Sequence, residues 1–118
     1  MLLTKHQMLS SEDLPFEDVE VSEWGGSVRV RVMTGIERDA WEASVYRQKD
    51  GKAEFNQANF RASLVARCLS DESGGIQFSE EEIIGLGKKS SRALEKIFRV
   101  ASRLNAITNE DQESVEKN

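Results

Sequence analysis

Two short stretches of alternating valines constrain the fold of this chain more than any other feature. An acidic residue separates the valines of the first stretch, arginines separate those of the second, and the segment SEWGGS joins the two. The valines are Val19 and Val21, then Val28, Val30 and Val32. Alternation with period two places the valines on one face of each strand and the charges on the other. Because the two glycines of the link favour a turn, we predict a two-stranded antiparallel hairpin over residues 17–33.

The polar face of this hairpin carries opposite charges. We expect Asp18 and Glu20 of the first strand to face Arg29 and Arg31 of the second, with each pair contributing about 0.2–1 kcal/mol. An isolated hairpin is only marginally stable in water, so its valine face must pack on helices.

Capping signals and apolar periodicity predict about four helices after the hairpin. Thr34 with Glu37, and Ser79 with Glu82, have the spacing of capping boxes. The helices are predicted over about residues 34–48, 56–69, 79–86 and 89–107, with the segment KDGK ending the first. The fold class is therefore α+β and mainly α-helical, with the hairpin packed on a bundle of about four helices.

Three of these helices have an apolar face at helical spacing, which we expect to be buried. In chain order these faces are Ile36, Ala40, Trp41, Ser44 and Val45; Phe60, Leu64, Val65, Cys68 and Leu69; and Leu94, Ile97, Phe98, Ala101 and Leu104. Residues 17–107 are then one compact domain. Residues 1–16 form an N-terminal arm that is either loose or holds one short helix, and residues 108–118 form an acidic tail, either disordered or a last helix capped by Thr108 and Asp111.

The net charge of −5 conceals a separation of charge along the 118 residues. Residues 1–27 hold one lysine and six acids, residues 28–107 hold fourteen basic and eleven acidic residues, and residues 108–118 hold one lysine and four acids, which gives −5, +3 and −3. Such a pattern influences the choice of partner and not the fold. With no long apolar run, the chain has no predicted signal peptide or membrane span, and we expect a cytoplasmic protein.

The most pronounced charge feature is a row of five cations on and just before the last helix. These are Lys88, Arg92, Lys96, Arg99 and Arg103, spaced three or four residues apart. That spacing aligns them in one stripe beside the apolar face. The stripe is either a solvated face, partly neutralised by Glu80–Glu82 or by the acidic tail, or a docking surface for an acidic or helical partner, or a nucleic-acid site. Trp24, at the predicted turn, is either a second anchor for a partner or part of the core.

No group of residues has the pattern of a catalytic or metal site. His6 is the only histidine, and Cys68 is the only cysteine and falls on an apolar helix face. Glu80–Glu82 occupy a first helical turn, where the helix dipole already favours acids. We therefore expect no enzymatic activity, no cofactor and no bound metal.

Four segments in order resemble the tail assembly chaperones of bacteriophages with long, non-contractile tails. They are VEVSEWGGSVRVRVMTGIERDAWEA, NFRASLVARCL, FSEEEIIGLGKKSSRALEKIF and ASRLNAIT. The resemblance implies a small, mainly helical protein that binds the long tape measure protein, keeps it soluble, and helps recruit tail tube subunits. It also implies action in the host cytoplasm, absence from the finished virion, and a longer form made by ribosomal frameshifting. For such a frameshift, Glu116, Lys117 and Asn118 are compatible with a slippery A AAA AAC sequence, in which the Glu116 codon supplies the first A.

Two alternatives remain open from the residues alone. One is a host-type regulatory adaptor, either antitoxin-like or an anti-activator, that acts by protein–protein contacts. The other is a nucleic-acid binder that uses the cationic stripe, which requires steeply salt-dependent binding. Self-association through the free strand edges of the hairpin is a further possibility.

Overall fold

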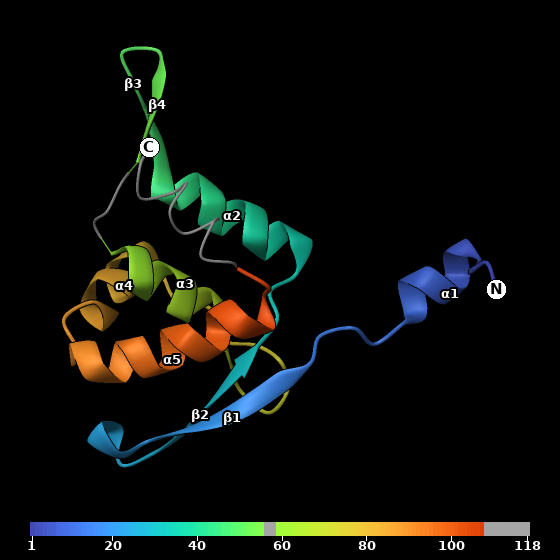
Figure 1. Cartoon of the computed structure of the whole chain (residues 1–118), viewed down its shortest axis with the longest axis horizontal. Coiled ribbons are helices and arrows are strands. Elements are labelled where there is room, and N and C mark those ends of the chain that lie inside the picture. The colour runs from blue at the N-terminus through green and yellow to red at the C-terminus, as the bar shows by residue number, and fades with distance from the viewer. Residues whose placement is uncertain (56–58, 108–118) are drawn as a thin grey trace.

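The computed structural model describes residues 1–55 and 59–107, with the backbone alone for residues 47–49 and 53–55. Its helices and strands follow one another along the chain as Figure 1 shows. They are α1 (Lys5–Ser10), β1 (Phe16–Val21), a 3-10 turn (Ser22–Trp24), β2 (Gly26–Arg31), α2 (Gly35–Val45), β3 (Tyr46–Lys49), β4 (Lys52–Phe55), α3 (Phe60–Cys68), β5 (Leu69–Ser70), α4 (Glu80–Leu86) and α5 (Ser91–Leu104). The fold is α+β, as predicted.

The main sheet has three strands in the order β1-β2-β5, so the prediction of a two-stranded hairpin was incomplete. β1 and β2 pair antiparallel with Val19 opposite Val28, and β5 adds to the other edge of β2 with Leu69 opposite Val30. Leu69 has extended backbone angles, so the chain leaves the helical conformation at the predicted last residue of that helix. The backbone groups of Leu69 and Ser70 then pair with a strand edge that a hairpin alone leaves open.

One of the two predicted cross-strand charge pairs is present. Asp18 lies opposite Arg29, whose Nε and Nη2 donate to the carboxylate at 2.7 and 3.0 Å. The prediction for Glu20 and Arg31 was wrong, because Glu20 lies opposite Ser27 and Arg31 lies opposite Phe16. The register places Arg31 at the end of β2, from which its side chain reaches the start of α2.

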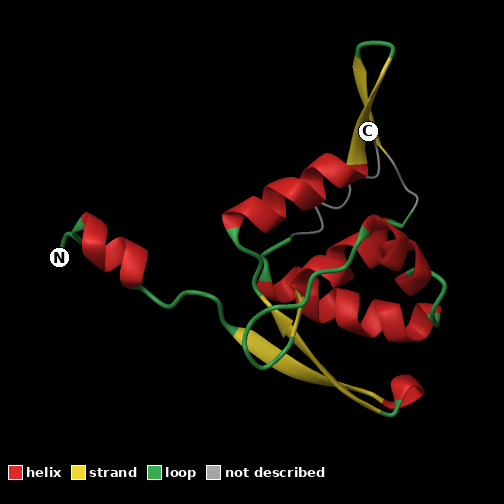
Figure 2. Ribbon diagram, turned by 180° about the vertical axis from the view of Figure 1, so that it is seen from behind, coloured by secondary structure: helices red, strands yellow, loops and turns green. Residues whose placement is uncertain are grey.

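The core forms where α5 packs against both the β1–β2 ribbon and α3, while α3 packs in turn against α2 and α4 (Figures 1 and 2). Its largest fully buried side chains come from the ribbon, α2, α3 and α5: Val21, Val30, Val45, Leu64, Val65, Cys68 and Ile97. The predicted apolar face of α3 is buried throughout, and that of α5 is buried except at half-exposed Leu104. The packing of α5 thus agrees with its 3.6-residue periodicity.

α2 begins where predicted but differs from its prediction in which residues it buries and in where it ends. Thr34 and Glu37 form the predicted capping box, and Trp41 and Val45 are buried. Ile36, however, is 83% exposed and Ala40 is exposed too, so the prediction that both are core residues was wrong. The apolar face of α2 continues one turn beyond the part that α3 covers.

α2 also ends at Val45 instead of about Gln48, because the chain enters a second hairpin, β3–β4. Asp50 and Gly51 form its two-residue turn, with φ of 55° and 77°. Positive φ at both positions is what a tight hairpin turn of this type requires, and Asp-Gly is a favoured pair for it. KDGK therefore connects two strands where the sequence reading had only a helix end.

The remaining boundaries are close to those predicted. Ser79 caps α4 through the predicted capping box with Glu82, and Ser90 caps α5. Of the two alternatives for residues 1–16, the structure has the short helix, α1. The proposed start of α3 at residue 56 and the possible cap at Thr108 and Asp111 lie outside the described residues.

Candidate partner-binding surface

The predicted cationic stripe lies mainly on α5. Arg92, Lys96, Arg99 and Arg103 belong to this helix, whereas Lys88 lies in the turn between α4 and α5. The four helical cations are exposed, beside a face that includes buried Leu94 and Ile97. An amphipathic helix with one face in the core presents its opposite face to solvent, so these charges remain available for contact.

Two of the four helical cations are neutralised within the chain. Arg99 contacts Glu95 at 3.3 Å, and the second oxygen of Glu95 accepts a hydrogen bond from Arg61 at 2.8 Å. Arg103 forms an ion pair with Glu17 of β1. These acids differ from those predicted, since Glu80 instead lies 3.9 Å from Arg67. Any contribution from the acidic tail falls outside the described residues.

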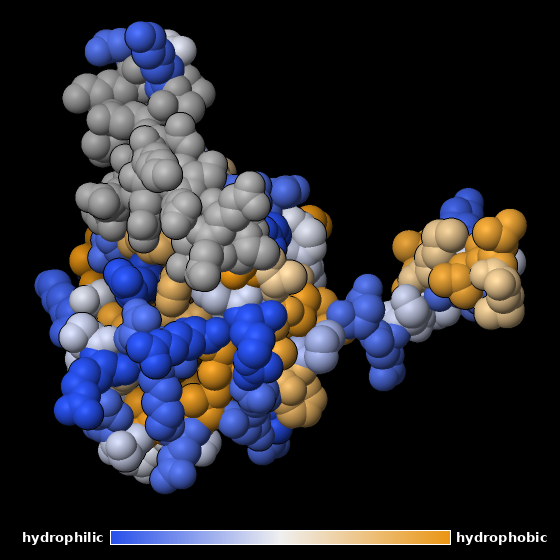
Figure 3. Space-filling model, in the orientation of Figure 1, coloured by the Kyte–Doolittle hydropathy of each residue, from blue (hydrophilic) through white to orange (hydrophobic). Residues whose placement is uncertain are grey.

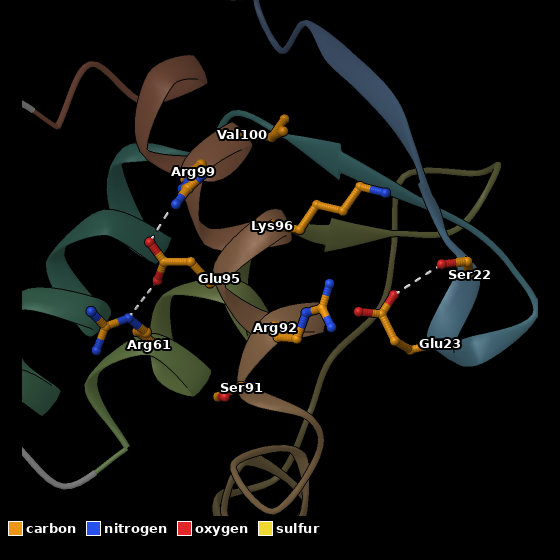
Figure 4. Close-up of a pocket in the computed structure, with 9 residues that line it drawn as sticks. All are labelled: Ser22, Glu23, Arg61, Ser91, Arg92, Glu95, Lys96, Arg99 and Val100. Carbon is orange, nitrogen blue, oxygen red and sulfur yellow. Dashed lines mark hydrogen bonds and ion pairs between the residues drawn. The ribbon is translucent and has the colours of Figure 1, made fainter.

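Arg92 and Lys96 differ from the other two. Within residues 1–55 and 59–107, neither has a carboxylate oxygen within 4 Å. Figure 4 shows both side chains on the side of α5 that faces the 3-10 turn and Glu23. The backbone amide of Glu23 lowers the pKa of its own carboxyl group, and the Ser22 hydroxyl and the charges of Lys96 and Arg92 lower this pKa further. Glu23 therefore partly balances the two cations without forming an ion pair with them.

These side chains border an open groove of about 900 Å³ along the outer face of α5 (Figure 4). Its lining contains four cations, from Arg61 to Arg99, and two acids, Glu23 and Glu95, so its formal charge is 4 − 2 = +2. Val100 and the alkyl stems of the arginines and Lys96 supply apolar surface. A groove with this composition suits an elongated partner that carries carboxylates beside apolar side chains.

Trp24 ends the 3-10 turn and is half-buried against the core. The side chain is therefore neither a fully exposed anchor for a partner nor a fully buried core residue, the two roles that the sequence left open.

The sequence analysis did not select Glu23, Arg61 or Glu95, although all three line the groove. The spacing of Glu95 and Arg99, i and i+4 on a helix, was a signal for that pair.

The structure also locates the histidine and the cysteine that the sequence singles out. His6 is exposed on α1. Cys68 is fully buried, and burial raises its pKa to about 12. The described residues contain no group of three His, Cys, Asp or Glu side chains placed to hold a metal ion. In that same part of the chain, no helix has both the length and the apolar character to cross a membrane.

Asn105 links three parts of the fold, and sequence reasoning missed it. Its Oδ1 accepts a hydrogen bond from the Met33 backbone amide at 2.8 Å. Its Nδ2 donates to the Ala101 carbonyl at 2.8 Å and to the Cys68 sulfur at 3.3 Å. Because Asn105 is 8% exposed, these bonds satisfy polar atoms that water does not reach freely.

Comparison with protein-family models, with curated proteins and with solved structures found no match to this chain.

Proposed function

We propose that this protein is a phage tail assembly chaperone that binds the tape measure protein, keeps it soluble, and helps recruit tail tube subunits. The ordered series of four segments that resembles these chaperones is the observation that carries the proposal. The groove on α5 supports it, because its unpaired cations and apolar stems suit a helical client with acidic and apolar side chains.

The client would lie along α5, with acidic side chains near Arg92 and Lys96 and apolar side chains near Val100. Exposed ion pairs in water contribute little each, typically below about 1 kcal/mol, so this contact is reversible. Reversibility matters for a chaperone, because the tube subunits must replace it on the client. A polar-rimmed surface of modest area suits such a transient complex better than a large dry one.

Co-expression of this protein with the long helical product of a neighbouring gene tests the proposal. We expect the soluble fraction of that product to rise several-fold when the protein is present. Lys96→Glu reverses one unpaired charge in the groove and should reduce this gain, because it places a second acid beside Glu23. Lys52→Glu is the matched control, since it reverses an exposed charge on the distant β3–β4 hairpin (Figure 1).

An unchanged soluble fraction with the wild-type protein would contradict the chaperone proposal. The regulatory adaptor would then be the better hypothesis, and it predicts a small regulatory neighbour in the genome. Binding to DNA or RNA that weakens steeply with salt would favour the nucleic-acid alternative.

A further inference from the structure

Most of the large apolar side chains that remain exposed in the described residues gather in two places. Seven of the ten in the described residues belong to the N-terminal arm, residues 1–16. Of the other three, Ile36 on α2 and Ile76 on the loop before α4 line one groove, whereas Ile84 lies on α4 outside the lining of that groove. Two separate apolar surfaces on one small protein indicate sites that a partner covers.

The first surface is the arm with its helix α1. Thr4 and Gln7 form a complete capping box, and Leu3 and Met8 hold the two positions of a hydrophobic staple. The sequence thus favours helix at this site, yet every residue of the arm is exposed and α1 stands away from the body in both ribbon views (Figures 1 and 2). Figure 3 shows the apolar surface that results on α1. A helix of six residues is not stable alone in water, so α1 needs a surface to pack on.

The second surface is an open groove of about 240 Å³ between α2, α3 and the segment that leads into α4. We call it the α2–α4 groove. Its apolar lining consists of Ile36, Ala40, Ala66, Ile76, Phe78 and Ile83. Ala40 and Ala66 leave room between the larger side chains. The groove lies beside the part of the apolar face of α2 that α3 does not cover. The groove therefore offers apolar contacts to a short helix that presents leucine and methionine side chains.

The chain between α1 and β1 directs the arm away from its own body. Ser11–Leu14 contains no glycine for a sharp reversal, and Leu14 precedes Pro15, which favours an extended conformation. The Pro15 carbonyl accepts a hydrogen bond from the Val32 amide at 3.0 Å, which holds the end of this connection beside β2. An arm held outward in this way reaches a neighbouring molecule more readily than its own groove.

We propose that α1 of one copy packs into the α2–α4 groove of a second copy, and that the exchange is mutual. Reciprocal exchange of an identical segment closes a two-fold dimer and covers both apolar surfaces at once. Since each copy contributes an arm and a groove, the contact forms twice, and the dimer buries twice the area of one arm–groove contact. The dimer does not depend on the chaperone proposal, because the groove on α5 takes no part in it.

Cross-linking between two different single-cysteine variants tests this contact. Met8→Cys in one chain and Ile36→Cys in the other are mixed and treated with a short bis-maleimide, and the mixed pair is identified by mass. We expect this pair to form, because the exchange brings α1 next to the groove. The native Cys68 is fully buried and gives no background in the folded protein. Met8→Cys mixed with Lys52→Cys, on the distant β3–β4 hairpin, is the matched control and should give no pair.

The double variant with both new cysteines in one chain distinguishes the two possible origins of the arm. If dilute double variant gives only a cross-link within one chain, and the mixed pair does not form, the arm occupies its own groove and the proposal is wrong.

Oligomeric state provides an independent measurement. Light scattering after gel filtration should give a dimer for the wild-type chain. Leu9→Ser and Ile36→Ser should each weaken the dimer about tenfold or more, while Lys52→Ser should not. Leu9 and Ile36 are 81% and 83% exposed within one copy, so neither substitution disturbs the fold of the monomer. A wild-type chain that stays monomeric at high concentration, or a dimer insensitive to both changes, would overturn the exchange.

Discussion

Arg31 and Glu37 form a two-pronged ion pair across the junction between β2 and α2, with both N–O distances at 2.8 Å. The Glu37 carboxylate also accepts a hydrogen bond from the Thr34 amide, as part of the capping box of α2. Arg31 donates further to the Val32 and Gly74 carbonyls. One ion pair therefore joins the end of the sheet, the start of a helix and the loop after β5.

Replacing Glu37 with glutamine should destabilise the protein by about 2 kcal/mol, because it removes a charge-assisted pair whose arginine side chain is only 10% exposed. Urea unfolding followed by circular dichroism measures this change. Asp18→Asn is the matched control, since it breaks a similar arginine pair at a carboxylate that is 52% exposed, and it should lower the stability much less than Glu37→Gln does. Equal losses in the two variants would show that burial does not strengthen the Glu37 pair.

The same residue should govern much of the acid sensitivity of the fold. The Arg31 hydrogen bond is the main cause that lowers the pKa of Glu37 from 4.5 to about 2. Because the pKa is lower in the folded state, the stabilisation is complete above pH 4.5 and is lost as the pH falls toward 2, with a total of up to about 3 kcal/mol. The free energy of unfolding, measured from pH 6 to 2, should therefore decline less steeply in Glu37→Gln.

A residual decline should persist in that variant, because hydrogen bonds also lower the pKa of Asp18 and Asp71. If wild type and Glu37→Gln lose stability in parallel over this range, Glu37 is not the group responsible.

The sequence predicted those parts of the fold that depend on local signals. Alternating valines located the β1–β2 ribbon, and the Thr34 and Ser79 capping boxes located the starts of α2 and α4. The second hairpin was missed because Asp50 and Gly51 were interpreted as the end of a helix. That segment has no long alternation of apolar and polar residues, so periodicity gave no indication of strands.

Long-range contacts explain the other differences. β5 has two residues and exists because β2 has an open edge beside it. Ile36 matches the apolar face of α2, but within residues 1–55 and 59–107 no helix covers that position. At the candidate surface, helical spacing predicted the stripe of cations. It did not predict that Glu95 and Glu17 pair with Arg99 and Arg103, because these contacts form only in the folded chain.

Two buried serines should respond in opposite ways to replacement by alanine. The Ser102 hydroxyl is buried with no hydrogen-bond partner in the described part of the structure. Ser63 Oγ, in contrast, lies 2.8 Å from Ser44 Oγ and accepts a hydrogen bond from Arg67 at 2.9 Å. Removing an unpaired buried hydroxyl is neutral or stabilising by up to about 1 kcal/mol, whereas removing a paired one costs about 1–2 kcal/mol.

Thermal unfolding of Ser102→Ala and Ser63→Ala measures this difference. The two substitutions delete the same atom from buried helical positions, so each is the control for the other. A melting temperature that falls as far for Ser102→Ala as for Ser63→Ala would mean that the Ser102 hydroxyl has a partner.

Cys68 should report on the packing around Asn105. In the folded protein its thiol is fully buried with a pKa of about 12, so at pH 8 it should react with iodoacetamide only when the core opens. Asn105→Ala removes the hydrogen bonds to the Met33 amide and the Ala101 carbonyl and leaves the Met33 donor unpaired, which should cost about 2–3 kcal/mol. If labelling follows global unfolding, the labelling rate of Cys68 should then rise by roughly 30- to 150-fold, since each 1.4 kcal/mol is a factor of ten.

Mass spectrometry of timed samples measures this labelling rate, with Lys52→Ala as a surface control that should label at the wild-type rate. Fast labelling of the wild-type protein would mean that Cys68 is reached without opening of the core.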